Sequence, residues 1–498
     1  MEDNQRSKEF DRPFDHSSVK QTLSNSAIEL RKSKRESQAQ KCRNINEAPE
    51  WIKLNTHYPD SYTESDLPEI LSNLSIHEDS SFLYVAQAIR KLLCSSESAN
   101  GRIVISEVIN FIPIWLQRDD FTQLQYETAW ICTNISSSEY CQILEQIGAI
   151  KWIVNLLNSS RSEVRYQASW AISNIAANTP EERNLLVELG CLDLLALCLK
   201  LDGVKKKEQG TFVWAICNII RKRPPLDFII VKKVFEVLFP IVFSSNLIQV
   251  IDICWAINVY VSESEIIQVI LTPEYLHRFS ELCDSNKSKV VTIVLKVFGG
   301  IFYHSSISVK VCLEAGFAQV LNRCLRRKKS KEVIKNAIWT TANITGEKSN
   351  QLRYLFENNI FELIFDLAEN GVYQIRAECA WAICNACVIC SFEECVKLVE
   401  LGVINTLTSL LTSEINPSII LEALMHILKS GKELVSKDGQ ELFVMAFENT
   451  GGVEVIETLA LLKDNLKISL KAEKVLCLVR NQVEAEVGME MEDSKFDI

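Results

Sequence analysis

Two stretches share one pattern: Leu124-Gln-Tyr-Glu-Thr-Ala-Trp130-Ile-Cys-Thr-Asn134-Ile and Val164-Arg-Tyr-Gln-Ala-Ser-Trp170-Ala-Ile-Ser-Asn174-Ile. Their Trp residues are 40 residues apart, and an Asn follows each Trp four residues later. Further spacings of 44, 41 and 42 residues separate later copies, and an 84-residue gap holds two units because residues 294–301 keep the phase. The later copies lie around Trp214 and Asn218, Trp255, Trp339 and Asn343, and Trp381 and Asn385.

A second recurring motif has the same spacing as the Trp positions and marks the breaks between helices. It places a Gly, or once an Asn, after a short helix, at Gly148, Gly190, Gly316, Asn359, Gly402 and Gly451. A helical period of about 42 residues with this break is typical of armadillo repeats, more than of HEAT repeats. We therefore predict an all-α fold, an armadillo-repeat right-handed superhelical solenoid of about ten three-helix repeats. The array consists of an atypical cap near 66–100, eight units in phase and an irregular unit near 435–480.

The composition excludes several classes of function. The chain has 53 Lys and Arg against 64 Asp and Glu, a net charge of −11, so we expect no nucleic-acid partner. No run of about 18 apolar residues occurs, which predicts no membrane insertion. The charged segment Met1–Lys20 is unlike a secretory leader. The 17 Cys lie mostly in apolar helical runs, and we interpret them as reduced core residues.

No motif for catalysis stands out. The six His are isolated, and the 16 Gly are too few to form a phosphate loop. Cys387-x-x-Cys390, within the cluster Cys379–Cys395, is the pattern nearest to a metal site. It overlaps the helix of Trp381, so core packing is the better interpretation. We expect no enzyme activity, no metal and no cofactor.

The chain divides into three parts by composition. Residues 1–50 are polar, and a basic stretch within them predicts an arm that is largely disordered until it binds a partner. Residues 66–480 form the repeat array. Residues 481–498 are acidic and predict a disordered tail. The basic stretch contains Arg31, Lys32, Lys34, Arg35, Lys41 and Arg43.

The Trp and Asn of each pair lie one turn apart on one helix face, so stacked repeats place the pairs side by side. An Asn amide both donates and accepts, which suits the backbone of an extended peptide. Trp rings in parallel slots would hold Lys or Arg stems, with a cation–π attraction of roughly 0.5–2 kcal/mol. The alternative is that Trp packs the core and Asn caps or bonds back along the helix. Five pairs in register favour the binding interpretation.

Together these motifs resemble the importin alpha (karyopherin alpha) family. The basic stretch Ala27–Asn44 resembles its importin-beta-binding segment, and Leu124–Ile135 and Val164–Ala177 resemble its second and third repeats. The run Asn218-Ile-Ile-Arg221 resembles the fourth repeat, and Asn449-Thr-Gly-Gly-Val resembles the last. The likeness covers residues 27–480 and indicates a divergent member.

The resemblance implies two sites for nuclear localisation signals. The major site corresponds to Trp130, Asn134, Gln167, Trp170, Asn174, Asn178, Trp214 and Asn218. The minor site corresponds to Trp339, Asn343, Glu378, Trp381 and Asn385. Importin beta would bind the basic residues Arg31, Lys32, Lys34, Arg35, Lys41 and Arg43. A nuclear export receptor would bind the C-terminal repeats. Such a protein shuttles between cytoplasm and nucleus.

The chain departs from the family pattern where acids flank the ladder. The family's Asp after the third repeat's Asn is Asn178 here, and its acid in the seventh repeat is Asn336. Lys296 and Gly300 replace the Arg and Asn of the sixth repeat. Losing a charge-assisted bond at residue 178 costs about 1–3 kcal/mol of binding. We therefore expect signal binding that relies on stacking and backbone hydrogen bonds more than on charge.

Two functions remain open at this point. The first is a nuclear-import adaptor that binds cargo signals in a concave groove and links them to importin beta. The second is an armadillo scaffold that has lost signal reading and binds another protein. The retained Trp/Asn pairs favour the adaptor, and the lost acids favour the scaffold.

Overall fold

The computed structural model describes residues 59, 61–96, 98–327, 330–346, 351–413, 415–432, 434, 441–462 and 465–480. The basic segment predicted at 1–50 and the acidic segment at 481–498 lie outside the described residues. Every regular element in the described ranges is a helix, in agreement with the all-α armadillo prediction. The described residues divide into two compact units, one that ends at residue 263 and one that begins at residue 264, and we describe each by itself.

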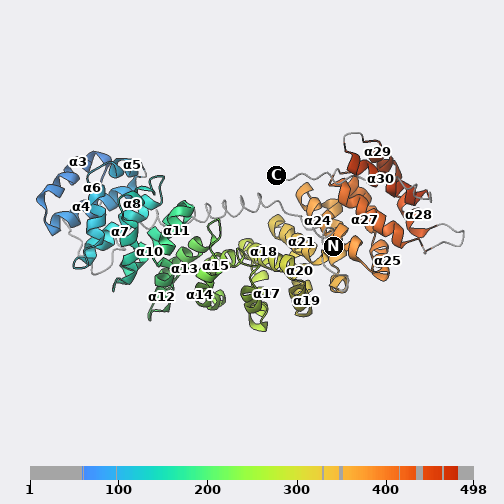
Figure 1. Ribbon diagram of the computed structural model, residues 1–498, viewed down its shortest axis with the longest axis horizontal. Helices are drawn as coiled ribbons and strands as arrows, with labels where there is room; N and C mark the ends of the chain where they lie inside the picture. The colour runs from blue at the N-terminus through green and yellow to red at the C-terminus, as the bar shows by residue number, and fades with distance from the viewer. Residues whose placement is uncertain are drawn as a thin grey trace, which may run out of the picture. The chain divides into compact units, whose positions relative to one another are not determined.

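The first unit begins with a cap and continues as short, medium and long helices in turn (Figure 1). The cap consists of η2 (Glu64–Asp66), α3 (Leu67–Ser72), η3 (Asn73–Ile76) and α4 (Asp79–Ser95). Three repeats follow: α5 (Ala99–Val104), α6 (Val108–Leu116), α7 (Thr122–Ser136); α8 (Ile143–Gln146), α9 (Ile150–Asn155) with η4 (Leu156–Asn158), α10 (Ser162–Asn178); α11 (Pro180–Glu188), α12 (Cys191–Lys200), α13 (Lys206–Arg221). The unit ends with α14 (Phe228–Leu238), η5 (Phe239–Phe243) and α15 (Leu247–Ile257).

The described part of the second unit contains five repeats of three helices each. The long helix closes each repeat, as in the first unit. They are α16 (Ser264–Ile270), α17 (Pro273–Cys283), α18 (Ser288–His304); α19 (Ser306–Glu314), α20 (Phe317–Leu325), α21 (Lys331–Thr345); α22 (Leu352–Glu357), α23 (Ile360–Asn370), α24 (Tyr373–Ile389); α25 (Phe392–Glu400), α26 (Val403–Leu411), α27 (Pro417–Ser430); α28 (Leu442–Glu448), α29 (Gly452–Ala460), α30 (Leu466–Val479).

The predicted breaks between helices are confirmed. Gly148, Gly190, Gly316, Gly402 and Gly451 all have positive φ between 67° and 95°, and Asn359 has φ 51° at the same phase. This left-handed conformation ends one helix and lets the next begin at a new angle, and only Gly or Asn adopts it at low cost.

One repeat does not have the expected three α-helices. The stretch between α13 and α14 contains Pro224 and Pro225, and it forms no first helix. Proline lacks an N–H and restricts the residue before it, so two in succession prevent a short helix from forming. The expectation of three helices is therefore wrong for this repeat, whose helices are α14, η5 and α15.

Side-by-side packing of the long helices holds each unit together. In the first unit α4 packs on α7, α7 on α10, and α10 on α13. In the second, α18 packs on α21, α21 on α24, α24 on α27, and α27 on α30. Buried Val, Ile, Leu and Ala fill these contacts, as at Val164, Ala168, Ala171, Ile172 and Ile175 of α10. This packing sets the ladder residues of neighbouring repeats against one another.

Candidate binding site along the Trp/Asn ladder

We use the name Trp/Asn ladder for the paired positions on the long helices. They are Trp130 and Asn134 on α7, Trp170 and Asn174 on α10, Trp214 and Asn218 on α13, Trp339 and Asn343 on α21, and Trp381 and Asn385 on α24. The same phase falls on Arg90 and Cys94 in α4, and on Lys296 and Gly300 in α18.

The Asn side chains join neighbouring helices of the first unit. Asn174 Nδ2 donates to the backbone oxygen of Thr133 at 3.2 Å, and Asn218 Nδ2 donates to that of Ser173 at 3.1 Å. Each acceptor comes immediately before the ladder Asn of the preceding helix. Both Asn side chains are buried, at 3% and 2% exposure.

The second unit repeats this bond. Asn343 Nδ2 donates to Gly299 O at 2.8 Å, and Asn385 Nδ2 donates to Ala342 O at 3.1 Å. One N–H of the amide therefore satisfies a helix carbonyl of the neighbouring repeat. The oxygen of Asn385 is buried without a hydrogen-bond partner. The sequence interpretation assigned these amides to a peptide backbone, whereas the structure uses one donor of each to join repeats.

The Trp rings differ in exposure along the ladder. Trp130, Trp170, Trp339 and Trp381 are half-buried, whereas Trp214 is 1% exposed. The rings of Trp170 and Trp214 meet edge to face, with centroids 5.4 Å apart and an interplanar angle of 75°. The prediction of parallel slots is wrong for this pair, because the edge-to-face arrangement is the one that favours the ring quadrupoles.

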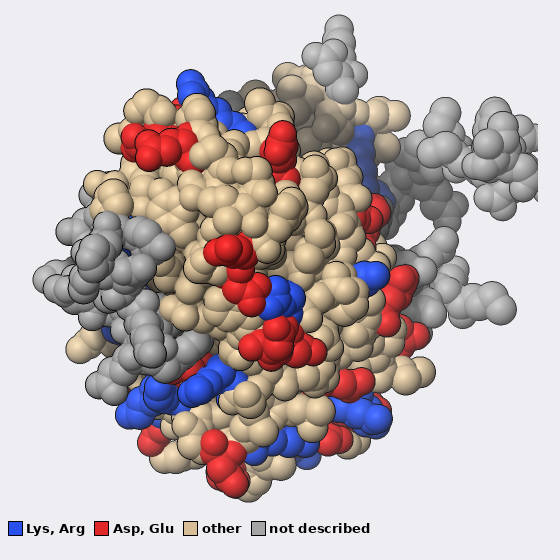
Figure 2. Space-filling view, turned by 90° about the vertical axis from the view of Figure 1, so that its left-hand side faces the viewer, with Lys and Arg blue, Asp and Glu red and all other residues tan. Residues whose placement is uncertain are grey.

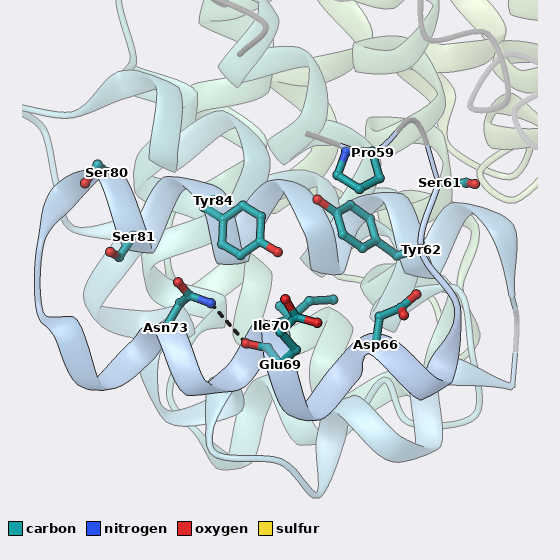
Figure 3. A pocket seen from close by; sticks show the side chains of 10 residues that line it. All are labelled: Pro59, Ser61, Tyr62, Asp66, Glu69, Ile70, Asn73, Ser80, Ser81 and Tyr84. Carbon is teal, nitrogen blue, oxygen red and sulfur yellow. Dashed lines mark hydrogen bonds between the residues drawn. The ribbon is translucent and has the colours of Figure 1, made fainter. Parts of the chain in front are cut away.

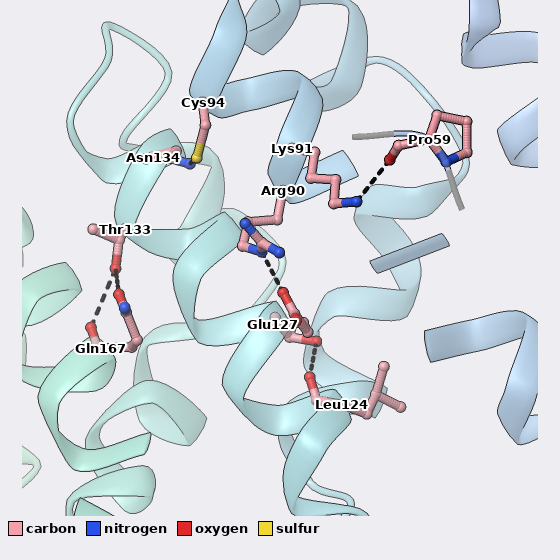
Figure 4. A network of polar contacts seen from close by, with 10 residues as sticks. Pro59, Arg90, Lys91, Cys94, Leu124, Glu127, Thr133, Asn134 and Gln167 are labelled. Atoms are coloured by element: carbon pink, nitrogen blue, oxygen red, sulfur yellow. Dashed lines mark hydrogen bonds and ion pairs between the residues drawn. The ribbon is translucent and has the colours of Figure 1, made fainter. Parts of the chain in front are cut away.

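An internal cation already covers the first ring of the ladder. The Arg90 guanidinium carbon lies 4.8 Å from the ring centroid of Trp130, and Arg90 Nε forms an ion pair with Glu127 of α7 (Figure 4). Glu127 is 1% exposed. Arg90 was not among the predicted site residues, although it lies 40 residues before Trp130 and so occupies the ladder phase in α4.

The remaining predicted residues of the first unit lie on or beside α10. Gln167 is 2% exposed, and its backbone oxygen accepts from Thr133 Oγ1 at 3.2 Å (Figure 4). Asn178 is half-buried at the end of the helix. Its Nδ2 donates to Glu182 Oε2 at 2.7 Å, and its Oδ1 accepts no hydrogen bond from the residues that the structure describes. The ladder face of α10 thus carries Trp170, Asn174 and Asn178 on successive turns.

The second unit carries an acid beside its ladder. Burial raises the pKa of Glu378 on α24 to about 7, against the opposing effect of the Lys335 ammonium. Glu378 Oε2 is buried without a hydrogen-bond partner. Burial also lowers the pKa of Lys296 on α18. Asn336 donates to Glu332 on its own helix, to the backbone oxygen at 2.7 Å.

The end of α13 holds two further groups that sequence reasoning missed. Arg221 donates to Asn218 Oδ1, and its Nη1 lies 3.7 Å from Asp252 Oδ1 on α15. Lys222 Nζ donates to Ala177 O at 2.9 Å and to Asn178 O at 2.6 Å. The ion pair with Asp252 and the capping by Lys222 have no periodic signal, because these partners come from different repeats.

A cavity of about 450 Å³ lies away from the ladder, in the cap (Figure 3). Tyr62 and Tyr84 stand edge to face across it, with ring centroids 6.4 Å apart, and Asp66 and Glu69 line its wall. The end of the first unit seen in Figure 2 carries acidic and basic side chains interspersed, with no broad patch of one sign.

Four of the five cysteines in the 379–395 cluster are packed in the core. Cys379, Cys384, Cys387 and Cys395 are buried, and burial raises the pKa of the Cys379 and Cys384 thiols well above the ordinary range. Within the described ranges, no three His, Cys, Asp or Glu side chains gather in a way that would hold a metal ion. None of the described helices is both long and apolar enough to cross a membrane.

Comparison with known proteins agrees with this architecture. The family described as Armadillo/beta-catenin-like repeat matches residues 142–177. An engineered protein of known structure superposes with a TM-score of 0.72 at 22% identity, covering 83% of this chain and 99% of that one. A structure from work on a phosphorylation switch between cadherin and beta-catenin superposes with a TM-score of 0.63 at 15% identity, covering 83% and 86%. The chain is an all-α armadillo-repeat protein.

Sequence relatives define the family more narrowly. The chain is 29% identical to importin subunit alpha-1b of Oryza sativa subsp. japonica over 425 residues, 82% of this chain and 78% of the relative. It is 28% identical to importin subunit alpha-5 of Arabidopsis thaliana over 456 residues, 90% of this chain and 87% of the relative. The chain is similar to importin alpha proteins over most of its length, at 28–29% identity to these two relatives. Its relatives support a role as an adaptor in nuclear import.

Proposed function

We propose that the chain is a non-enzymatic nuclear-import adaptor that binds basic localisation signals of cargo proteins along the ladder of α7, α10 and α13. One observation carries the proposal. Trp130 and Trp170 are half-buried rings on neighbouring helices, and an unpartnered acceptor, Asn178 Oδ1, lies two turns beyond Trp170. A Lys or Arg stem can lie on such a ring while its charged end reaches the acceptor.

The second unit supplies a separate face for a second basic cluster. Trp339 and Trp381 are half-buried on α21 and α24, and Glu378 lies one turn before Trp381. The unpartnered oxygen of Glu378 suits a cationic ligand. A bound Lys or Arg would favour the ionised carboxyl, because an opposite charge lowers the pKa that burial has raised.

The similarity to importin alpha proteins supports the remaining parts of the proposal. Importin beta would bind the segment that contains Arg31, Lys32, Lys34, Arg35, Lys41 and Arg43, which lies outside the described residues. The C-terminal repeats would bind a nuclear export receptor. The protein would shuttle between cytoplasm and nucleus.

An armadillo scaffold for another partner is the second candidate. The burial of Trp214, Asn174 and Asn218 favours it, because these three positions then present little surface to a signal peptide. Peptide binding decides between the two functions.

The test is titration of a fluorescent Lys-rich peptide with the full-length chain and with Trp170→Ala. We expect the wild type to bind and Trp170→Ala to lose about tenfold or more in affinity, because the ring is the surface on which the Lys stem lies. Trp152→Ala is the matched control, since Trp152 is also half-buried but lies on α9 away from the ladder. It should change affinity less than about twofold.

Two results would reject the adaptor proposal. One is no binding by the wild type below about 1 mM peptide. The other is an equal loss in Trp170→Ala and Trp152→Ala, which would place the peptide elsewhere. For importin beta, replacing Arg31, Lys32, Lys34 and Arg35 together by Ala should abolish co-purification, and unchanged co-purification would remove that part of the proposal.

A further inference from the structure

A buried carboxylate lies behind the end of the ladder on α10. Glu182, in the first turn of α11, is 1% exposed. Its Oε2 accepts from Asn178 Nδ2 at 2.7 Å, from the Thr179 backbone N at 3.1 Å and from Thr179 Oγ1 at 3.3 Å. Its Oε1 is buried and has no hydrogen-bond partner. No described Lys or Arg forms an ion pair with it.

The local fold explains the position of Glu182 but not its charge. Thr179, Pro180 and Glu182 form a capping box, in which Thr179 Oγ1 accepts from the Glu182 backbone N at 3.2 Å. Gln serves a capping box as well as Glu does. A carboxylate at 1% exposure is costly unless a positive group compensates it. An acid here therefore calls for a role beyond capping.

Asn178 connects this carboxylate to the ladder face. Because its Nδ2 is committed to Glu182, the orientation of the amide is fixed and Oδ1 points away from the carboxylate. Asn178 lies one turn after Asn174 and two turns after Trp170 on the same face of α10. The negative charge behind the amide polarises it, so that Oδ1 is a stronger acceptor than the oxygen of an isolated Asn.

A lysine of the protein is already bound at the same helix end. Lys222 Nζ donates to the backbone oxygens of Ala177 and Asn178, where the helix dipole is negative. The end of α10 therefore accepts an ammonium group. Lys222 occupies the backbone carbonyls and leaves Asn178 Oδ1 without a partner, while its charge opposes the approach of a second cation.

We propose that Asn178 and Glu182 act together to recognise one basic side chain of the bound peptide. Asn178 Oδ1 accepts a hydrogen bond from the ammonium or guanidinium group. Glu182 is a positioning residue that orients Asn178. It supplies the negative charge from behind Asn178, without touching the basic side chain itself. The inference rests on the proposed function and adds the determinant that selects a cation at this point of the ladder.

The test is the affinity of the full-length chain and its Glu182→Gln variant for a Lys-rich peptide and for a series in which each Lys is replaced in turn by Met. Glu182→Gln keeps the capping box and removes the charge. We expect it to bind the parent peptide about tenfold more weakly, the difference between a charge-assisted and a neutral hydrogen bond. We also expect one Lys position to matter in the wild type and to lose that importance in the variant.

Three further variants make the test specific. Glu181→Gln removes the same charge from the exposed neighbour on α11 and should leave the affinity within about twofold. Lys222→Met should tighten binding, because one opposing positive charge is gone. Asn178→Asp in the Glu182→Gln background should restore affinity, because the charge then lies on the contacting side chain itself. Restored affinity would also show that a protein carrying Glu182→Gln is folded.

The outcomes separate this inference from the proposed function. If the wild type binds the peptide and Glu182→Gln binds it equally well, the role of Glu182 is wrong and the adaptor function stands. An equal loss at every Lys position in Glu182→Gln would also overturn the inference, since a merely structural change has no preference for one position. If the wild type does not bind the peptide, both fail.

Discussion

The indole of Trp339 on α21 lies directly against the backbone of Gly299 on α18. A Cβ atom at residue 299 would be 2.2 Å from Cζ3 of the ring, closer than any real contact. Asn343, one turn further along α21, donates to the backbone oxygen of the same glycine at 2.8 Å. Both ladder residues of α21 therefore depend on a residue without a side chain in the neighbouring repeat.

Gly299→Ala is expected to destabilise the second unit, although alanine normally favours a helix. The gain in helix propensity is about 1 kcal/mol, and the displacement of a packed Trp ring costs about 1–3 kcal/mol. Urea unfolding followed by Trp fluorescence measures the difference. Gly210→Ala in α13 is the control, because its new Cβ would meet only the flexible Gln249 amide at 3.3 Å. If Gly299→Ala has the same free energy of unfolding as Gly210→Ala, the packing argument is contradicted.

The buried amide bonds of the ladder predict unequal effects of removing Asn. Asn174→Ala should lower the free energy of unfolding by about 1–3 kcal/mol, because the carbonyl of Thr133 loses a buried donor. Asn134→Ala should have a smaller effect, since Asn134 is half-buried and its Nδ2 reaches only the Cys94 sulfur, at 3.6 Å. Chemical denaturation of the two variants measures this, and equal losses would show that the repeat-to-repeat bond contributes nothing.

Arg90 and Glu127 form the buried ion pair at the start of the ladder. Arg90→Met should destabilise the first unit by about 3–5 kcal/mol, because it leaves Glu127 buried and uncompensated. Adding Glu127→Gln should recover most of that loss. The four proteins form a double-mutant cycle in thermal or urea unfolding, and additive effects would mean that the pair is not coupled.

Glu378 predicts a pH dependence of stability. Its folded pKa of about 7 lies above the ordinary value of 4.5, so the folded protein holds a proton that the unfolded chain has released. Stability should therefore fall as the pH rises from about 4.5 through 7, by roughly 2–3 kcal/mol from this group. Glu378→Gln should flatten this part of the profile, measured by urea unfolding between pH 5 and pH 8. A wild-type profile that is identical to that of the variant would refute the assignment.

Regular spacing made the fold readable from the sequence. The Trp phase predicted the long helices, and the left-handed Gly and Asn positions predicted the breaks between helices. These predictions succeed because a repeat contacts chiefly its neighbours, so local periodicity carries most of the packing information. The absent first helix before α14 was also visible in principle, in Pro224 and Pro225.

The site was less readable, because its properties depend on contacts between repeats. The sequence named Asn174 and Asn218 but could not show that their amides serve the carbonyls of Thr133 and Ser173. It placed Trp170 and Trp214 in parallel slots, whereas in the structure the two indole rings pack edge to face. The charge missing at residue 178 led us to expect little electrostatic recognition, and only the structure brought Glu182 against Asn178.

The sequence by itself determined the all-helical armadillo array, its period and the face on which the ladder lies, because these follow from spacing along a single helix. Only the tertiary structure decided which ladder atoms form hydrogen bonds within the protein and which remain available to a ligand. Burial and hydrogen bonding join residues some 40 positions apart, as between Asn174 and Thr133, and that pairing depends on the exact rotation of one helix against the next. The burial of Glu182 is a consequence of the tertiary packing, whereas its hydrogen bond with Asn178 is local and joins residues four positions apart.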